Sequence, residues 1–360
     1  MNEQRIQRVI ERMKELNVTQ TIVTSTPDLF YLLGKWIESG ERMIALYLNT
    51  NGEKKLIINE IVTNLKALSG VEILAYNDDG NPVEILSNVI NPKEPLAIDK
   101  FWHAHFLIEL MEKMPELKPI NSKAVDAVRM EKDAEERKLL LEAADVVDKA
   151  VTDLIDYLKK NPHVTENKAA EKLKEIFASY GTNEYSFDPI IAYGENGADP
   201  HHTTDSVSTL KKGDSIVIDI GGRTNVYCSD TTRTVFYDHC SDEEEKVYNT
   251  VKAANLAGIA AVKPGVRFCD IDKAARKVIE DAGYGKYFTH RTGHSIGIED
   301  HENPSVSSTD ETIVREGMAF SIEPGIYLPG KFGVRIEDIV IATKDGCDIL
   351  NKTSKDLKVI

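Results

Sequence analysis

Cysteine is scarce in this chain of 360 residues, and none of its four cysteines forms a Cys-x-x-Cys pair. Neither zinc binding by paired thiolates nor a disulfide scaffold is therefore expected. No segment approaches the roughly 20 consecutive apolar residues that a membrane-spanning helix requires. The first residues, MNEQRIQRVIERMKELNV, also lack the apolar stretch and cleavage site of a secretory signal. We expect a cytoplasmic protein with reduced thiols.

Positive charge is also in short supply. The chain has 44 Lys and Arg against 59 Asp and Glu, a net charge of −15. Such a surface repels nucleic acids and anionic membranes, so we expect neither as a partner. The hydrophobic fraction of 41% and the charged fraction of 29% are typical of a globular protein. At roughly 100–200 residues per domain, the length predicts two domains.

The first part of the chain alternates short apolar runs with helical patterns. Its first residues predict an amphipathic helix, because apolar side chains recur there at spacings of three and four. Strands are predicted at Thr21–Val23, Met43–Leu48, Leu56–Ile58, Val71–Leu74 and Leu96–Ile98, with helical patterns at Asn59–Leu68 and Phe101–Met114. This alternation predicts an α/β domain over residues 1–128 with a mixed or parallel sheet.

The second part, residues 129–360, combines longer predicted helices with apolar runs that predict strands. Helices are predicted at about Asp133–Lys160, Glu166–Tyr180, from Ser241 to a point before Pro264, and Asp270–Ala282. The third of these begins with a capping box, in which Ser241 and Glu244 bond each other's backbone. Strands are predicted at Ser215–Ile220, Tyr227–Tyr237, Met318–Ile322 and Val334–Thr343. We therefore predict an α+β domain whose antiparallel strands carry helices on one side.

Acidic residues lie inside two of these predicted strands. Asp219 is surrounded by Ile and Val in SIVIDIGG, and Asp230 follows in YCSDTTRTVF. The residues between them favour a turn, so a hairpin would bring the two acids together. Buried carboxylates that repel one another need a compensating charge, which a metal cation supplies. The alternative is that Asp230 pairs with Arg233 while Asp219 caps a turn.

Two glutamates repeat this pattern further along the chain. Glu323 follows the predicted strand Met318–Ile322, and Glu337 lies among apolar residues in FGVRIEDIVIA. Because side chains alternate along a strand, Arg335 and Glu337 should point to the same side. The pair alone is equally compatible with an ion pair on a half-exposed sheet.

Histidines complete the set of candidate ligands. The segment HRTGHSIGIEDHENP holds His290, His294 and His301, and the loop AYGENGADPHH holds His201 and His202. Carboxylates with one imidazole suit a hard or borderline divalent ion. Five ligands of which four are carboxylates suit two neighbouring ions better than a single zinc.

These residues resemble the ligand set of the pita-bread metallopeptidases, which include methionine aminopeptidase, aminopeptidase P, prolidase and the creatinases. The similar motifs are IDIGGRTNVYCSDTTRTV, HRTGHSIGIEDHENP, SIEPGIY and GVRIEDIV. In size and layout, the N-terminal domain is similar to that of the prolidase and aminopeptidase P branch. The resemblance implies an α+β protein, with a creatinase-like domain at 1–128 and a pita-bread catalytic domain at 129–360.

The resemblance also implies a ligand set and roles. Two divalent ions, most simply Mn²⁺ with Co²⁺ as an alternative and Zn²⁺ or Fe²⁺ less suited, would be held by Asp219, Asp230, His294, Glu323 and Glu337. Asp230 and Glu337 would bridge the ions, and a hydroxide between the ions would be the nucleophile. Glu323 would also carry a proton to the leaving nitrogen. His201 and His301 would stabilise the tetrahedral intermediate, and Arg335 would hold a substrate carboxylate or orient Glu337.

The implied function is hydrolysis of a short peptide at an Xaa-Pro bond by a homodimeric Xaa-Pro dipeptidase. Aminopeptidase P and a related amidohydrolase are the enzymatic alternatives, since the motifs indicate neither a preference for proline nor the length of the substrate. Creatinase-type enzymes typically lose the metal ligands, whereas all five positions are present here. The non-enzymatic alternative is a binding module that keeps the fold without catalysis.

Overall fold

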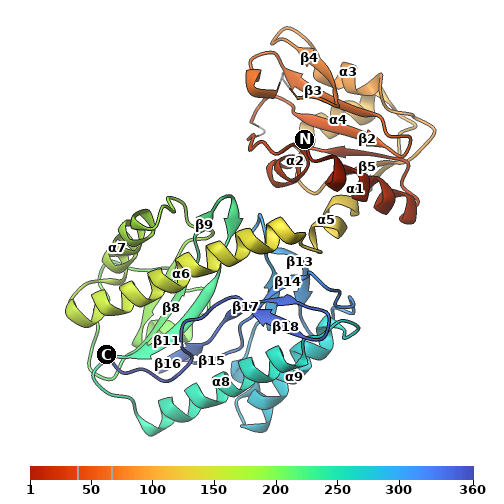
Figure 1. Ribbon diagram of the computed structural model, residues 1–360. Coiled ribbons are helices and arrows are strands. Elements are labelled where there is room, and N and C mark those ends of the chain that lie inside the picture. The colour runs from red at the N-terminus through yellow and green to blue at the C-terminus, as the bar shows by residue number, and fades with distance from the viewer. Residues whose placement is uncertain (39, 66–67) are drawn as a thin grey trace. The chain divides into compact units, whose positions relative to one another are not determined.

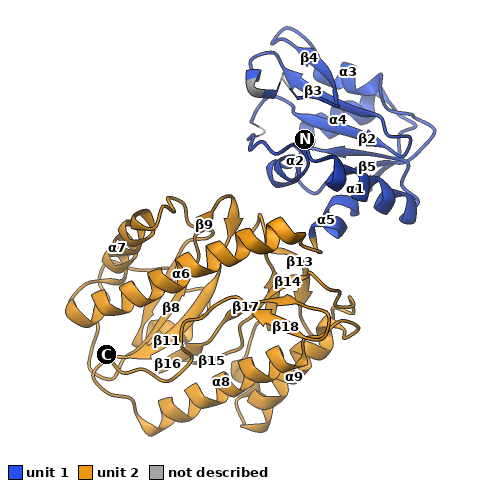
Figure 2. Cartoon of the chain, in the orientation of Figure 1, with its two compact units in different colours: residues 1–129 blue, residues 130–360 orange. Residues whose placement is uncertain are grey.

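The computed structural model describes residues 1–38, 40–65 and 68–360. The chain forms two compact units, residues 1–129 and 130–360 (Figure 2). Within the described ranges, no helix is both long and apolar enough to cross a bilayer. Figure 1 labels most of the helices and strands of each unit.

The first unit is built on one six-stranded sheet in the order β4-β3-β2-β1-β5-β6. Its strands are β1 Gln20–Val23, β2 Ala45–Asn49, β3 Lys54–Asn59, β4 Glu72–Tyr76, β5 Leu96–Ile98 and β6 Pro119–Asn121. The β1–β5, β5–β6 and β3–β4 pairs are parallel, and the β1–β2 and β2–β3 pairs are antiparallel. The predicted mixed α/β sheet is therefore confirmed.

Helices cover this sheet. They are α1 Glu3–Glu15, α2 Thr26–Leu33, α3 Pro82–Ser87, α4 Ala104–Lys113 and α5 Ala124–Arg129. Asn2 and Ser25 cap the first two by accepting hydrogen bonds from backbone N–H groups of the first turn. The apolar faces of α3 and α4 pack with the strands into one core, while α1 contacts α2 and α5.

The second unit combines long helices with antiparallel sheets. Its helices are α6 Ala134–Lys160, α7 Glu166–Ser179, α8 Asp242–Ala261 and α9 Phe268–Asp281. A capping box starts α6 at Asp133 and another starts α8 at Ser241, so the prediction for α8 is confirmed. Apolar residues of α6 and α7 share a core with a three-stranded sheet of this same unit, and those of α8 and α9 pack on other strands of the unit.

The described strands of this unit fall into four groups. β7 Ile190–Tyr193, β8 Ser215–Ile220 and β11 Thr231–Phe236 form a sheet with β8 in the centre, and β9 Arg223–Thr224 pairs with β10 Tyr227–Cys228. β12 Gly293–Ser295, β13 Glu302–Val306, β14 Ala319–Ile322, β17 Asp338–Ala342 and β18 Cys347–Ile349 form a five-stranded sheet. β15 Gly325–Leu328 pairs with β16 Phe332–Arg335. This is the predicted α+β arrangement.

Two predicted strands are each interrupted, and each interruption falls at a candidate ligand. The predicted strand Val334–Thr343 breaks at residues 336–337, because β16 pairs with β15 whereas β17 pairs with β14. The chain changes sheets at Glu337. The predicted strand Tyr227–Tyr237 breaks at Asp230, because β10 pairs with β9 and β11 with β8. Strand alternation therefore does not decide where these acids point.

The helical pattern predicted at Asn59–Leu68 is wrong for the part that the structure describes. Asn59 ends β3, and its side-chain oxygen accepts the N–H of Ile61 at 3.1 Å, which turns the chain. Only Thr63–Leu65 then forms a short 3₁₀ turn, and residues 66–67 lie outside the described ranges.

Candidate active site

A cavity of about 1000 Å³ in the second unit gathers the predicted site residues. Seven of the eight line it, namely Asp219, Asp230, His294, Glu323, Arg335, His201 and His301. The eighth, Glu337, is 1% exposed and lies with Asp230 and His294 so that one ligand atom of each falls within 4.8 Å of the others. The chain thus brings together residues that are more than a hundred positions apart.

The first two acids come from neighbouring strands. β8 and β11 are antiparallel, with Asp219 opposite Thr232, and Asp230 immediately precedes β11. Both carboxylates are buried. The predicted hairpin arrangement is confirmed. The alternative pairing of Asp230 with Arg233 is wrong, because Arg233 forms its ion pair with Asp338 at 2.8 Å.

His294 lies between two of the carboxylates. Its Nε2 is 3.5 Å from Oδ2 of Asp230 and 3.4 Å from Oε1 of Glu323. Its Nδ1 faces the carbonyl of Ser295 at 3.2 Å, which assigns the ring proton to Nδ1 and leaves Nε2 free to coordinate. The preceding Gly293 lets β12 approach β14 closely, since a Cβ there would collide with the carbonyl of Ser321. This approach places the imidazole beside Glu323.

The hydrogen-bond pattern of the acids tests whether cations fit. Three buried oxygens, Oδ1 of Asp219, Oδ1 of Asp230 and Oε1 of Glu337, accept no hydrogen bond from any described residue. An unsatisfied buried carboxylate oxygen is costly, and three that converge with an imidazole are rare unless a cation binds. Oxygen ligands with one imidazole suit Mn²⁺, Co²⁺ or a similar divalent ion. The residues present therefore fit the implied metals.

The electrostatics of the acids point the same way. Burial raises the pKa of Asp230 and of Glu337 well above the usual range, and the neighbouring carboxylates raise it further. Burial likewise raises the pKa of Glu323 to about 7. The carboxylates of the cluster carry more negative charge than the nearby cationic side chains neutralise. Divalent cations would supply the missing positive charge.

Arg335 is the cation of the cluster. It is 2% exposed, and its Nη2 lies 2.5 Å from Oδ2 of Asp219. Its Nε donates to Oγ1 of Thr232 at 3.1 Å, and that hydroxyl donates to Oε2 of Glu337 at 2.7 Å. The alternative prediction, an ion pair between Arg335 and Glu337 on a half-exposed sheet, is therefore wrong. Arg335 contacts Asp219 directly and reaches Glu337 through Thr232.

This network extends through the side chains of Tyr327 and His290, to which the sequence analysis gave no role in the site. Arg335 donates to the hydroxyl of Tyr327 at 2.7 Å, and that hydroxyl lies 2.7 Å from Nε2 of His290, whose Nδ1 faces a carbonyl. Burial raises the pKa of Tyr327 to about 12 and lowers that of His290 to about 3. His290 appeared in the sequence only as part of a histidine-rich segment. The register of β15 with β16 is what brings Tyr327 close to Arg335.

The two remaining predicted histidines lie on the open side of the cavity. His201 is exposed, and its backbone N–H donates to Asp199 at 3.0 Å. The ring of His301 lies 4.1 Å from that of His294 between centroids, and its side chain is 58% exposed. Partial burial lowers the pKa of His301 to about 4, and the neighbouring His294 lowers it further. Both histidines line the same cavity as the buried cluster without belonging to it.

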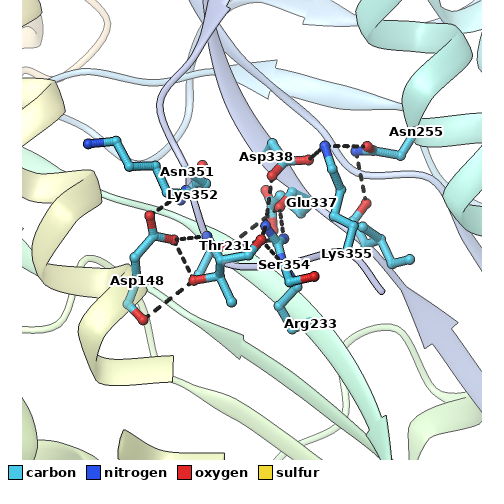
Figure 3. Close-up of polar contacts among 12 residues, drawn as sticks. Asp148, Thr231, Arg233, Asn255, Glu337, Asp338, Asn351, Lys352, Ser354 and Lys355 are labelled. Atoms are coloured by element: carbon cyan, nitrogen blue, oxygen red, sulfur yellow. Dashed lines mark hydrogen bonds and ion pairs between the residues drawn. The ribbon is translucent and has the colours of Figure 1, made fainter. Parts of the chain in front are cut away.

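A second network contacts Glu337 from the opposite face of β11 (Figure 3). Side chains alternate along this strand, so Arg233 points away from the face that carries Thr232. Its Nη1 donates to the carbonyl of Glu337 at 2.5 Å, and its Nη2 pairs with Asp338 and donates to the carbonyl of Thr353 at 2.8 Å. This buried guanidinium thus connects a candidate ligand with the C-terminal segment, residues 351–360.

The C-terminal segment is held at two further points. Lys355 donates to Asp338 at 2.8 Å and to Asn255 at 3.2 Å, and Asn255 donates to the carbonyl of Ile322 next to Glu323. Asp148 of α6 accepts the backbone N–H groups of Lys352 and Thr353 (Figure 3). The backbones beside Glu323 and Glu337 are therefore both tied to a network outside the cavity.

Comparison with known proteins agrees with this geometry. Residues 138–344 match the model of metallopeptidase family M24, and residues 5–131 match that of the Creatinase/Prolidase N-terminal domain. An uncharacterized peptidase of Staphylococcus aureus is 33% identical over 358 residues, which are 98% of this chain and 99% of the relative. The crystal structure of the dipeptidase PepE from Mycobacterium ulcerans has a TM-score of 0.93 at 32% identity, covering 99% of this chain and 97% of that one. An Xaa-Pro dipeptidase from Bacillus anthracis has a TM-score of 0.90 at 28% identity, covering 99% of each chain.

The fold and the buried carboxylate cluster together define a pita-bread metallopeptidase. The chain belongs to metallopeptidase family M24 and carries the Creatinase/Prolidase N-terminal domain of the prolidase and aminopeptidase P branch. The resemblance stated from its motifs and the predicted fold class are both confirmed. The protein is accordingly a peptidase that acts on peptide substrates.

Proposed function

We propose that this peptidase is an Xaa-Pro dipeptidase that requires two divalent metal ions. The observation that carries the proposal is the set of three buried carboxylate oxygens without donors among the described residues, beside the imidazole of His294. The names of two structural relatives, a dipeptidase and an Xaa-Pro dipeptidase, support the substrate class. An Xaa-Pro bond lacks an N–H group, so a peptidase for it is a distinct specialist.

The proposed metal ligands are Asp219, Asp230, His294, Glu323 and Glu337. When bound, two divalent cations lower the pKa of water enough to supply hydroxide near neutral pH and polarise the scissile carbonyl. Mn²⁺ is the proposed metal, because oxygen ligands dominate the set. Asp230 and Glu337 would both hold the ions. Each keeps one buried oxygen without a hydrogen-bond donor from the described chain, and a carboxylate oxygen of each lies within 4.8 Å of a ring nitrogen of His294.

The chain's own groups then move one proton and stabilise one developing charge. The attacking oxygen forms a bond to the carbonyl carbon, the carbon–nitrogen bond breaks, and the leaving nitrogen gains a proton. Glu323 lines the cavity beside His294 and would take a proton from the nucleophile and pass it to that nitrogen. His201 and His301 line the open side of the cavity, where their imidazoles can donate to the oxyanion.

Arg335 has a positioning role in this proposal. Its Nε, Nη1 and Nη2 donate to Thr232, Tyr327 and Asp219, which leaves the cavity side to other groups for substrate binding. Of the two roles considered from the sequence, we therefore propose that it orients ligands. We further propose that residues 129–360 form the catalytic domain and 1–128 the N-terminal domain of a cytoplasmic homodimer, as the family likeness implies.

A metal-reconstitution assay tests the function. Metal-stripped protein would be reloaded separately with Mn²⁺, Co²⁺, Zn²⁺ or Fe²⁺ and offered an Xaa-Pro dipeptide, an Xaa-Pro-Xaa tripeptide and an Xaa-Ala dipeptide. We expect metal-dependent hydrolysis of the Xaa-Pro dipeptide, highest with Mn²⁺, and little with the other two. Preference for the tripeptide would instead identify an aminopeptidase P. No hydrolysis of any peptide with any metal would refute the peptidase proposed here.

A further inference from the structure

A second group of ligand-type side chains lies beside the cavity, outside the cluster described above. Glu166, His202 and Asp205 each offer an atom within 4.8 Å of the others. Glu166 is the first residue of α7 and is fully buried. Neither the ligand set nor the proposed chemistry uses this carboxylate, so its role requires a separate explanation.

Hydrogen-bond donors already occupy both oxygens of Glu166. Oε1 accepts the backbone N–H of Tyr193 and the side-chain amide of Asn196, each at 2.9 Å. Oε2 lies 2.7 Å from Nε2 of His202 and accepts the backbone N–H of Asp205 at 3.0 Å. Two of the four donors are backbone amides, which cannot turn away to admit a cation. The group is therefore a filled anion pocket and not a metal site.

The four donors all belong to one stretch of chain, and that stretch carries His201. We call residues 194–208 the His201 loop. Glu166 binds the chain directly before the loop, at Tyr193, and again within it on both sides of His201, at Asn196 and Asp205. The connection is reciprocal, because the backbone N–H of Asn167 donates to the carbonyl of Asp205 at 2.9 Å. One carboxylate thus fixes both ends of the segment that holds His201.

The same helix forms a wall of the cavity. Asn167, Ala170 and Lys174 of α7 line it together with Pro200 and His201 of the loop. The His201 loop has one 3₁₀ turn, Gly194–Ala198, and within the described part of the chain few other backbone hydrogen bonds connect it to the rest of the unit. Its attachment to the buried start of α7 sets where His201 lies relative to the opposite wall.

We propose that Glu166 is a positioning residue, which acts on the reaction through His201 by anchoring the loop to α7. The inference rests on the proposed function, because it assigns His201 a contact with the reacting peptide. Glu166 touches neither the metal ligands nor the substrate in this proposal. Its removal should therefore affect turnover and loop mobility while metal binding stays intact.

The variant Glu166→Gln tests the proposal at almost constant shape. Whichever way the glutamine amide lies, its NH₂ group faces the N–H of either Tyr193 or Asp205, and neither can accept a hydrogen bond. His202 can adapt by changing tautomer, but a backbone amide cannot. We expect faster hydrogen exchange across residues 193–208 in the full-length protein than in the wild type. The matched control, Glu175→Gln on the exposed side of α7, should leave this exchange unchanged.

Kinetics then show whether the anchor acts through His201. For Glu166→Gln we expect kcat for the Xaa-Pro dipeptide to fall on the order of 10- to 100-fold, since small displacements of a catalytic group have effects of this size. The affinity for Mn²⁺, measured by calorimetry, should stay within about twofold. The double variant with His201→Ala should be no slower than His201→Ala alone, because the anchor has nothing left to position.

Three results would overturn the inference: unchanged hydrogen exchange in the loop, loss of Mn²⁺ binding in Glu166→Gln, or additive kinetic effects in the double variant. If Glu166→Gln does not fold, Asn196→Ala removes one donor and leaves the carboxylate with three, and we expect smaller changes in the same direction. The exchange measurement does not depend on catalysis. A wild type that hydrolyses no Xaa-Pro peptide would refute the proposed function, whereas an unchanged loop would refute the anchor.

Discussion

At the scale of single residues, Thr232 shows how few atoms couple the charged groups of the site. Its hydroxyl accepts from Arg335 and donates to Glu337, and it lies opposite Asp219 in the sheet. A hydroxyl can do both at once because it carries one donor and two lone pairs. The carboxylates keep their remaining lone pairs directed into the cluster, where cations are proposed to bind.

The charge of Asp230 is the first residue-scale prediction. Asp230→Asn keeps the shape of the side chain and removes its charge, so we expect metal content to fall and hydrolysis to drop by at least ~10³-fold. Metal-free Asp230→Asn should melt no lower than the metal-free wild type, because burial and neighbouring acids make this carboxylate unfavourable without a cation. Metal analysis, peptide assay and calorimetry measure the three quantities. Full activity with normal metal content would contradict the ligand assignment.

His290 gives a prediction about pH. Burial lowers its pKa to about 3 in the folded protein, against about 6.5 in an unfolded chain. Between these values only the unfolded chain binds the proton, so this stabilisation is complete above about pH 6.5 and is lost as the pH falls toward 3. We expect the free energy of unfolding to change by up to about 1.4 kcal/mol per pH unit from this group.

The variant His290→Gln isolates this contribution, because glutamine still offers an acceptor to the hydroxyl of Tyr327. Urea unfolding of metal-stripped wild type and variant between pH 4 and 6.5 should give a flatter pH dependence for the variant. Equal slopes would show that His290 is protonated in the folded state or that its environment is more exposed to water.

At the scale of elements, the C-terminal segment and β11 together support the start of β17. Arg233 is 2% exposed and donates to Glu337, Asp338 and Thr353. Removing one partner of a buried ion pair leaves an uncompensated charge, which costs more than the pair itself contributes. The structural support of a candidate metal ligand thus comes from residues at the far end of the chain.

We predict that Arg233→Met lowers the free energy of unfolding by about 3–5 kcal/mol, since Asp338 then keeps Lys355 as its one cationic partner among the described residues. The affinity for Mn²⁺ should fall by roughly 10- to 100-fold, as is usual when support for a metal ligand is lost. Chemical denaturation and calorimetry measure both. Lys352→Met is the matched control, because this side chain is exposed in the same segment. Similar losses in the control would contradict a specific role of Arg233.

At the scale of the whole molecule, the proposed ligands all lie in the unit formed by residues 130–360. A ligand that binds only the folded state stabilises it by an amount that depends on its concentration relative to Kd. Cations should therefore stabilise this unit and leave residues 1–129 unaffected.

We predict that stripping the metal lowers the melting temperature of the second unit and that Mn²⁺ restores it. At a free concentration of 100 times Kd, one site contributes about 2.7 kcal/mol, which corresponds to roughly 5–10 °C for a unit of this size. Differential scanning calorimetry of the full chain measures this, with Ca²⁺ as a control because it prefers more oxygen ligands and no imidazole. Equal melting temperatures with and without Mn²⁺ would contradict a metal site in this unit.

Sequence patterns singled out the candidate ligands but not the residues that surround them. Asp219 and Glu323 were recognisable because an acid within or directly after an apolar run requires an explanation. Tyr327, Arg233 and Glu166 were not, because tyrosine, arginine and glutamate are common and their roles depend on partners far away in the chain. Glu166, for example, bonds residues 27 to 39 positions later.

By itself the sequence determined the division into two parts, the fold class and the set of acids and histidines that the family motifs single out, because apolar periodicity and local motifs carry that information. Only the tertiary structure decided which charges meet. The chain changes sheets at Glu337, so neither strand alternation nor proximity in sequence fixes its direction. Arg335 therefore pairs with Asp219 and Arg233 with Asp338, since partners of buried charges are selected by the packing of strands about a hundred residues apart.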